Sequence, residues 1–338
     1  MKPVIFGLAG ETLSDEERAF FKDCDPAGYI LFGRNIRDKA QLRALTDDLR
    51  EVAGREDLFI LIDQEGGRVA RMRPPVWPDF PAAAAFDALY DVAPSSAIEA
   101  ARCNGRALGA MLSEAGITAN AAPVLDVRQP GASDIVGDRS FGGEPMRVAA
   151  LGRATLEGLR DGGVVGVIKH MPGHGRALVD SHLELPRVDA SGAELELDIA
   201  PFRTLNWAPV GMTCHLLYTA WDAERAASLS PTVIGDIIRG SIGFDGLLMS
   251  DDLDMKALNG APDDLALGVV EAGCDIALNC WARMDEMTAI AARLPEMSDK
   301  SRERLARATA TIAAGPDGHW PMDRAIATRD ALLAKSLA

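Results

Sequence analysis

Eight short apolar segments recur along the chain of 338 residues, and each is followed by a loop and then by a stretch with helical character. Each segment is a continuous apolar run, which is typical of parallel strands that are covered on both faces. Strands that alternate with helices predict a parallel sheet of the α/β class. Eight such units without an intervening linker favour a closed (β/α)8 barrel of the TIM type. The predicted strands span residues 4–9, 29–32, 58–62, 118–126, 164–170, 210–216, 246–250 and 275–279.

The segments between these strands carry helix signals. Ser14 precedes two acidic residues and is typical of a helix N-cap. Leu42, Leu45 and Leu49 have the spacing of one helix face. An open, doubly wound sheet is the alternative architecture, but the turn at residues 7–10 lacks the glycine spacing GxGxxG that usually accompanies it. The predicted helices span residues 15–23, 38–53, 96–115, 145–161, 231–239, 263–272, 284–294 and 301–314.

The chain is expected to form one domain. A TIM-type barrel typically needs about 250 residues, and no Pro/Ser-rich linker divides this sequence. We therefore predict a single catalytic (β/α)8 domain over residues 1–338, with residues 295–338 as C-terminal outer helices. Charges of both signs alternate after Leu294, so this tail is expected to be a solvated outer helix without a site.

Composition and charge exclude several classes of protein. The chain has 35 basic and 50 acidic residues, a net charge of −15 that opposes binding to a nucleic-acid backbone. No run of 18 apolar residues occurs, so no membrane span is expected, and the N-terminal residues do not resemble a signal peptide. The five cysteines form no CxxC pair, which favours buried, reduced thiols in a cytoplasmic protein. Nothing in the sequence indicates an oligomeric state.

Ionisable side chains gather where the predicted strands end. They occur in residues 63–68 (Asp-Gln-Glu-Gly-Gly-Arg), at Asp126, in residues 169–175 (Lys-His-Met-Pro-Gly-His-Gly), at His215 and in residues 250–252 (Ser-Asp-Asp). The C-terminal ends of barrel strands form the active site of TIM-type enzymes. Burying charges there is costly, so folding alone does not require them. This pattern predicts an active site at that end of the barrel.

A metal site or a cofactor is not expected. His170, His174 and His182 match no standard zinc spacing. The glycine-rich residues 172–175 are not followed by the Lys-Ser/Thr of a phosphate-binding loop, so a tight turn is the better interpretation. The sequence assigns no catalytic role to His174, His215 or Asp126.

Four motifs together are more specific. Residues 63–69 (Asp-Gln-Glu-Gly-Gly-Arg-Val), 169–175, 180–182 (Asp-Ser-His) and 250–253 (Ser-Asp-Asp-Leu) resemble motifs of the family 3 glycoside hydrolases. More narrowly, they resemble the bacterial β-N-acetylglucosaminidases of peptidoglycan recycling. The resemblance runs from about residue 5 to about residue 285, with the motifs in the family's order.

The resemblance implies a role for each matching position. Asp251 matches the carboxylate nucleophile, His182 the acid/base and Asp180 the carboxylate that orients it. Asp252 is interpreted as a supporting residue. Five further positions match contacts to sugar hydroxyls: Asp63, Arg71, Arg139, Lys169 and His170. The expected substrate is therefore a small carbohydrate or muropeptide that carries a terminal β-linked N-acetylglucosamine.

The sequence departs from the family pattern at three positions. Met171 stands where an aromatic residue or isoleucine is common, and Arg176-Ala177 replaces the usual Asp-Thr. These changes leave the catalytic pair intact but affect the resting conformation of the loop that carries it. Arg68 is interpreted either as a surface charge or as a structural partner of Glu65.

The implied residues suit the chemistry of glycoside cleavage. The reaction needs a nucleophile below the sugar ring and a proton donor at the leaving oxygen. An aspartate with a pKa near about 4 is ionised at neutral pH. A histidine starts near about 6.5 and needs little adjustment to serve first as acid and then as base. The predicted function is hydrolysis with retention, through a covalent glycosyl-enzyme on Asp251.

Three alternatives stay open at this point. A family 3 β-glucosidase or β-xylosidase would share the barrel but take its acid/base from elsewhere. A β-N-acetylglucosaminide phosphorylase would use phosphate in place of water, which a neutral histidine permits. A non-catalytic sugar-binding barrel would need neither Asp251 nor His182.

Overall fold

The computed structural model describes residues 1–181, 183–313 and 321–336. Eight parallel strands close into a barrel in the order β1-β10-β9-β7-β5-β4-β3-β2, which confirms the predicted (β/α)8 architecture. Two further strands, β6 (Arg187–Val188) and β8 (Leu217–Tyr218), pair in a small separate sheet. The barrel strands are β1 (Lys2–Gly7), β2 (Pro26–Leu31), β3 (Phe59–Ile62), β4 (Ala119–Asn120), β5 (Val165–Met171), β7 (Val210–Thr213), β9 (Leu247–Asp252) and β10 (Ile276–Asn279).

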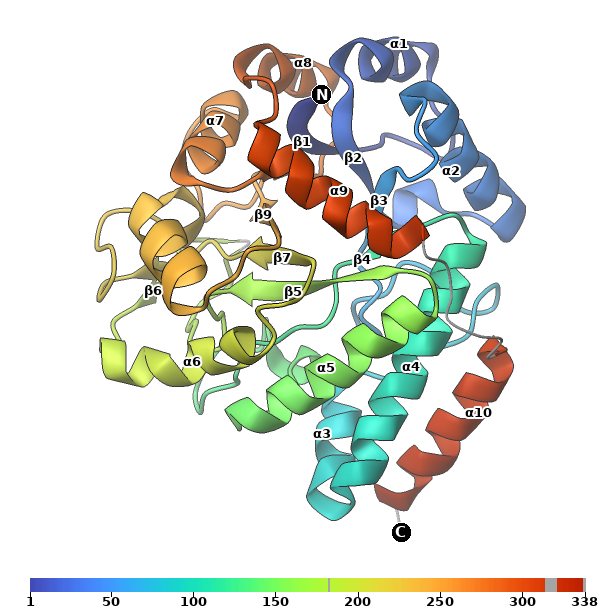
Figure 1. Ribbon diagram of the computed structural model, residues 1–338, viewed down its shortest axis with the longest axis vertical. Coiled ribbons are helices and arrows are strands. Elements are labelled where there is room, and N and C mark those ends of the chain that lie inside the picture. The colour runs from blue at the N-terminus through green and yellow to red at the C-terminus, as the bar shows by residue number, and fades with distance from the viewer. Residues whose placement is uncertain (182, 314–320, 337–338) are drawn as a thin grey trace.

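Helices surround the barrel (Figure 1). Each predicted helix has a counterpart within a few residues, although the segment predicted at 231–239 is a π-helix over Val233–Ser241. The prediction missed α3 and α6, and it gave no bounds for α10 within the outer helices expected over residues 295–338. One reason lies in α6, which contains Pro201, a residue that normally ends a helix. The helices are α1 (Asp15–Cys24), α2 (Lys39–Ala53), α3 (Ala83–Val92), α4 (Pro94–Glu114), α5 (Pro145–Asp161), α6 (Gly192–Thr204), α7 (Pro262–Ala272), α8 (Met284–Arg293), α9 (Asp299–Ala313) and α10 (Met322–Leu333).

The first helix begins at the predicted N-cap. The Ser14 hydroxyl accepts the Glu17 backbone N–H at 3.1 Å, and a Glu17 carboxylate oxygen accepts the Ser14 N–H at 3.0 Å. This reciprocal capping box satisfies two N–H groups that the helix leaves unpaired. The other Glu17 oxygen accepts the Ala9 N–H at 2.9 Å and fixes the loop between β1 and α1.

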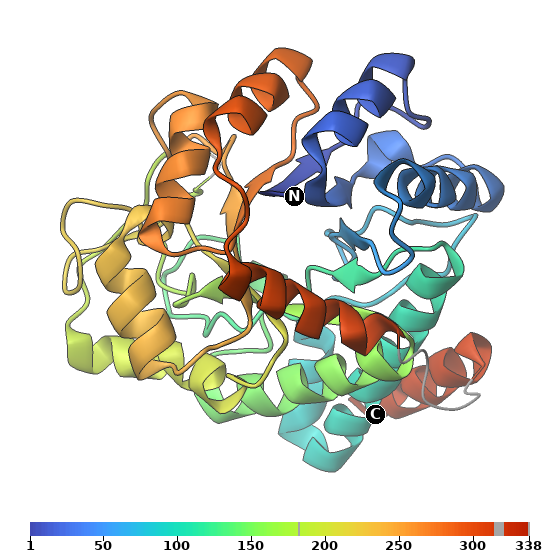
Figure 2. The ribbon, with the colours of Figure 1, turned by 45° about the horizontal axis from the view of Figure 1, so that its top comes forward.

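Helix α9 covers the N-terminal end of the barrel (Figures 1 and 2). Its Leu305 and Ala308 are buried in the same apolar cluster as the side chains that fill the barrel interior. Arg304 is only 7% exposed and donates to the buried Asp275 at 3.0 Å. The expectation of a solvated outer helix was therefore wrong for this face of α9, because alternating charge in the sequence does not reveal an apolar stripe beneath it.

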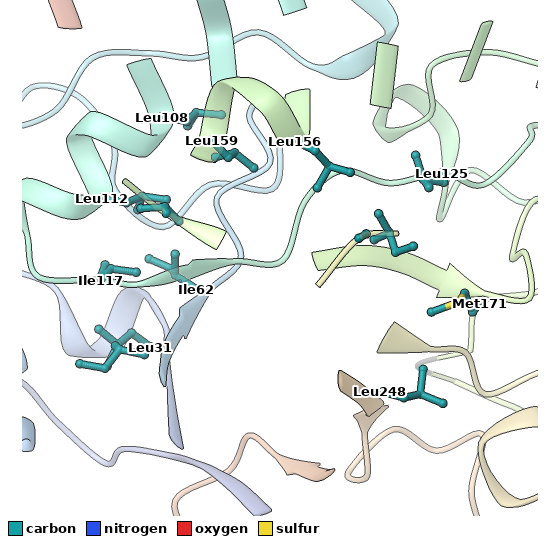
Figure 3. Packing of buried hydrophobic residues seen from close by; sticks show 14 of the residues in the cluster. Leu31, Ile62, Leu108, Leu112, Ile117, Leu125, Leu156, Leu159, Met171 and Leu248 are labelled. Atoms are coloured by element: carbon teal, nitrogen blue, oxygen red, sulfur yellow. The ribbon is translucent and has the colours of Figure 1, made fainter. Parts of the chain in front are cut away.

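A second apolar layer lies between the strands and the outer helices. Figure 3 shows part of it, with Leu108 and Leu112 of α4 beside Leu156 and Leu159 of α5. Helices α4 and α5 approach each other closely at glycines. A Cβ atom on Gly158 would lie 2.2 Å from the Arg102 carbonyl oxygen, so only glycine fits this crossing.

The substitution Gly158→Ala is expected to destabilise the fold. The new methyl group meets backbone rather than a flexible side chain, and overpacking of this kind costs roughly 1–3 kcal/mol. Urea unfolding followed by circular dichroism measures the loss. Gly235→Ala is the matched control, since a Cβ there has no neighbour within 4 Å and alanine is the better helix former by about 1 kcal/mol. Equal stability of the two variants would contradict the packing argument.

Candidate active site

A cavity of about 250 Å³ opens at the C-terminal ends of the barrel strands. It is slightly smaller than the roughly 300 Å³ at which pockets for drug-sized ligands begin, which suits a single sugar ring. Every predicted sugar-contacting residue lines it, together with the predicted nucleophile: Asp63, Arg71, Arg139, Lys169, His170 and Asp251. The structure thus brings these six predicted residues together in one cavity.

The loop after β3 is shaped by Gln64. The Asn120 side chain accepts the Gln64 N–H at 3.0 Å and donates to the Gln64 carbonyl at 2.9 Å. The Gln64 amide oxygen in turn accepts the backbone N–H groups of Arg71 and Met72 at 2.7 and 3.0 Å. The loop therefore folds back on itself and places Arg71 beside Asp63, with 3.2 Å between guanidinium and carboxylate.

A buried charge network forms the wall of the cavity. The Lys169 ammonium is 2% exposed and lies 2.7 Å from Glu65 and 3.0 Å from Asp63. Arg139 donates two hydrogen bonds to Glu65, at 2.7 and 2.8 Å. Glu65 was not among the predicted site residues. Its position two residues after Asp63 in the same strand-end motif was the available signal.

Ion pairing keeps this network charged. Burial by itself would raise the pKa of the Glu65 carboxyl, but Arg139 and Lys169 bring the pKa well below its usual range. Burial would likewise lower the pKa of Lys169, and the Glu65 and Asp63 carboxylates reverse the effect and raise it. Fixed N–H donors and carboxylate acceptors thus face the cavity, as recognition of sugar hydroxyls requires.

His170 is held by Asp126, one of the residues to which the sequence assigned no role. Asp126 is fully buried and accepts the His170 ring Nδ1–H at 2.7 Å and the His170 backbone N–H at 3.1 Å. Burial would raise the pKa of Asp126, but the His170 ring and the His174 backbone N–H lower it to about 2. Arg139 approaches the other ring nitrogen at 3.5 Å. The ring plane of His170 is therefore fixed toward the cavity.

Asp251 stands at the end of β9 with its carboxylate lining the cavity. One carboxylate oxygen accepts the Asp252 backbone N–H at 2.9 Å. Burial would raise the pKa of Asp251, but the His170 ring, this N–H and the Lys169 charge bring it below the ordinary value. The carboxylate is therefore ionised at neutral pH, as a nucleophile must be.

The pKa of the neighbouring Asp252 is shifted in the opposite direction. Burial and the charge of Asp254 raise its pKa to about 7. One carboxylate oxygen accepts the N–H groups of Asp254 and Cys280, each at 3.2 Å. The pKa values of two adjacent carboxyl groups are thus pushed apart, which leaves Asp251 as the ionised one. Asp252 also lines the cavity.

His215 supports this strand end from the side. Its ring Nε2 lies 2.9 Å from the Asp252 carbonyl oxygen, which can only accept, so Nε2 carries the proton. Nδ1 then accepts the Ser228 hydroxyl at 2.7 Å. Burial lowers the pKa of His215 and keeps the ring neutral.

The loop after β5 carries the predicted acid/base. Asp180 is half-buried and makes polar contacts, whereas His182 lies outside the described residues. Arg68 does not pair with Glu65. It donates to Asp138 at 2.9 Å and to the Asp134 carbonyl at 2.7 Å, because the loop after β4 lies closer to its guanidinium.

Comparison with known proteins identifies the family. Residues 5–313 match the glycosyl hydrolase family 3 N-terminal domain. The chain belongs to glycosyl hydrolase family 3. It is 40% identical to a β-hexosaminidase of Alkalilimnicola ehrlichii over 312 residues, which cover 90% of this chain and 88% of the relative. The predicted family and the assignment as a glycoside hydrolase are confirmed.

Solved structures of family 3 proteins have the same fold. NagZ from Neisseria gonorrhoeae is 33% identical, with a TM-score of 0.87 and coverage of 98% of each chain. The same protein in complex with N-trifluoroacetyl-D-glucosamine is 32% identical, with a TM-score of 0.84 over 99% of this chain and 97% of that one. This family 3 barrel thus matches its relatives over nearly the whole chain.

Two properties of the described residues concern ligands and membranes. Among residues 1–181, 183–313 and 321–336, no three histidine, cysteine or acidic side chains cluster in a way that could hold a metal ion. None of the helices in that part of the chain combines the length and apolar character that crossing a bilayer requires.

All five cysteines are free and buried, as predicted.

Proposed function

We propose that this family 3 hydrolase is a retaining β-N-acetylglucosaminidase that removes terminal β-linked N-acetylglucosamine. The observation that carries the proposal is the cavity itself. It is lined by the ionised Asp251 and by the fixed donors and acceptors Asp63, Lys169 and Arg139, the last two of which pair with Glu65. The β-hexosaminidase relatives and the neighbour bound to an N-acylated glucosamine support this substrate class.

The proposed reaction proceeds in two steps. In the first, an Asp251 carboxylate oxygen attacks the anomeric carbon, the glycosidic C–O bond breaks, and His182 gives a proton to the departing oxygen. In the second, His182 takes a proton from water, and the water oxygen attacks the anomeric carbon and releases Asp251. Two inversions give net retention. Asp180 is proposed to bind the His182 ring and steady its protonated form.

The five cavity residues are proposed to hold the sugar. Arg71 and Lys169 supply N–H donors, Asp63 supplies acceptors, and His170 and Arg139 face the same space. Because Asp63 is already bound by Arg71 and Lys169, its oxygens are fixed before a substrate arrives. Such preorganised contacts position the anomeric carbon over Asp251 at little entropic cost.

The natural substrate is proposed to be a muropeptide that ends in 1,6-anhydro-N-acetylmuramic acid, formed during cell-wall recycling in the cytoplasm. The family resemblance of the motifs suggests this leaving group. Five free, buried cysteines suit a reducing compartment. A cavity sized for one sugar suits an enzyme that removes single residues from a chain end.

Proton NMR of the products tests the proposal. With an aryl β-N-acetylglucosaminide, the first detectable product is expected to be the β-anomer of N-acetylglucosamine, which then mutarotates. Turnover of the matching aryl β-glucoside is expected to be slower by about 100-fold or more, since fixed polar groups without partners disfavour the analogue. Initial release of the α-anomer would exclude retention. Faster cleavage of the glucoside would overturn the substrate class.

The same assay in phosphate buffer separates hydrolysis from phosphorolysis. Phosphorus NMR is expected to detect no sugar 1-phosphate while free sugar accumulates. A dominant sugar 1-phosphate product would make the protein a phosphorylase. Complete inactivity of a folded sample on every N-acetylglucosaminide would favour a non-catalytic sugar-binding barrel.

A further inference from the structure

We propose that His174 and Ser181 are positioning residues for the proposed acid/base. The proposal rests on the proposed function, because it concerns the residue that follows Ser181 in the sequence. Neither residue has a role in the proposed reaction. Both line the cavity, and both are buried, with exposed fractions of 4% and 1%.

Ser181 is held at two points. Its hydroxyl oxygen lies 3.1 Å from the His174 ring Nε2. Its carbonyl oxygen accepts the Ala257 N–H at 3.2 Å, from the loop that follows the nucleophile strand β9. The residue is thus joined to two strand ends, one on each side.

The loop around Ser181 is also anchored at its start. Arg176 donates to the buried Asp198 of α6 at 2.7 Å, and the Ala177 carbonyl accepts the Ser133 N–H at 2.8 Å. Leu178 is then 69% exposed before the chain returns to the buried Ser181. The contacts of Ser181 therefore provide a further anchor for this loop.

The hydrogen bond to Ser181 is the feature of the His174 ring that supports this role. Its ring Nδ1 has no hydrogen-bond partner among the described residues, so Ser181 supplies the polar contact of the ring there. Burial lowers its pKa to about 4, so the ring is neutral across the working range and its bond to a hydroxyl does not change with pH. The His174 backbone N–H donates to Asp126 at 2.7 Å.

Asp126 joins this anchor to the sugar site. The same carboxylate binds the His174 N–H and orients the His170 ring in the cavity. One buried group thus sets both the wall that contacts the sugar and the residue that holds Ser181. Displacement of a catalytic group by about 1 Å can cost about 100-fold in rate. Loss of the Ser181 contact should therefore appear in proton transfer, without a matching loss of sugar binding.

Leaving-group dependence distinguishes positioning from simple stability. Ser181→Ala and His174→Ala are assayed on two aryl β-N-acetylglucosaminides, one with an acidic phenol and one with a weakly acidic phenol. We expect kcat/KM to fall about 10- to 100-fold on the weakly acidic phenol and less than about 3-fold on the acidic one. His174→Gln, whose amide can still reach Ser181, is expected to recover most of the activity. Thermal unfolding is measured for every variant.

Ser301→Ala is the matched control. It removes a buried serine hydroxyl that donates to Asp275 at 2.8 Å, at the opposite end of the barrel. A comparable loss of stability without leaving-group dependence is expected there. An equal fall on both substrates in Ser181→Ala, or no recovery in His174→Gln, would overturn the proposal. If Ser181→Ala does not fold, the two His174 variants give the same comparison.

His182→Ala, assayed alongside, separates this proposal from the proposed function. If His182→Ala shows no leaving-group dependence, His182 is not the acid/base and the mechanism itself fails. If His182→Ala shows it and Ser181→Ala does not, the mechanism stands and only the positioning role of Ser181 and His174 is wrong.

Discussion

Replacing Asp251 with alanine is expected to lower kcat on an aryl β-N-acetylglucosaminide by roughly 10⁴-fold or more, as removal of a nucleophile does in other covalent mechanisms. The carboxylate stands at the end of β9, is ionised, and lines the cavity together with the residues proposed to hold the sugar. No other described carboxylate in the cavity can substitute for it. Asp63 is paired with Lys169 and Arg71, and the raised pKa of Asp252, about 7, leaves it largely protonated at mildly acidic pH.

Azide makes the Asp251→Ala test specific. A small anion can enter the space that the carboxylate leaves and attack the anomeric carbon from the same face. The expected product is the α-glycosyl azide, with restored turnover. The exposed Asp285→Ala, on the outer helix α8, is the control and should retain the parent kcat. Substantial activity without azide, or a β-glycosyl azide from Asp251→Ala, would assign the nucleophile elsewhere.

The location of the site at the strand ends was predictable from the sequence, because a parallel barrel brings the residues that follow its strands to the same end. Asp63, Lys169, His170 and Asp251 each follow an apolar run, and parallel strands bring their ends to the same mouth. Strand boundaries were less predictable. The segment predicted at 118–126 contains only the two-residue β4, since Pro123 has no N–H to continue the ladder.

The partners within the site were not predictable. Glu65 has three arginines within the next eight residues, and the sequence suggested Arg68 as its partner. The structure pairs Glu65 with Arg139, 74 residues away, because the loop after β4 folds over the loop after β3. The bond between Asp126 and His170 likewise joins two strands through side chains. Such choices depend on loop geometry, for which periodicity and spacing give no signal.

Glu65→Gln is expected to destabilise the protein by about 3 kcal/mol at pH 7. Breaking one partner of a buried ion pair costs about 3–5 kcal/mol, because the opposite charge stays buried without compensation. In this variant the cations Lys169 and Arg139 lose the carboxylate that they share, at 2.7 Å from each. Glutamine keeps the size of the side chain, so the effect reports the charge. Urea unfolding at several pH values measures it.

The pH dependence gives the sign of this effect. The folded state lowers the pKa of Glu65 below its ordinary value of 4.5, so the stabilisation is fully present above that value and is lost as the pH falls below it. The difference between parent and Glu65→Gln should therefore be constant from pH 6 to 8 and shrink below about pH 4.5. KM should rise as well, because Arg139 and Lys169 line the cavity that is proposed to bind the sugar.

Asp47→Asn provides the matched control for Glu65→Gln. It breaks the exposed pair between Arg43 and Asp47, at 2.9 Å on the surface of α2, where both side chains are about half exposed. Exposed pairs of this spacing contribute about 0.3–0.5 kcal/mol. A loss in Glu65→Gln no larger than in this control, with KM unchanged, would mean that water reaches the Glu65 network and screens its charges. The cavity wall would then be too loosely held to orient a sugar over Asp251.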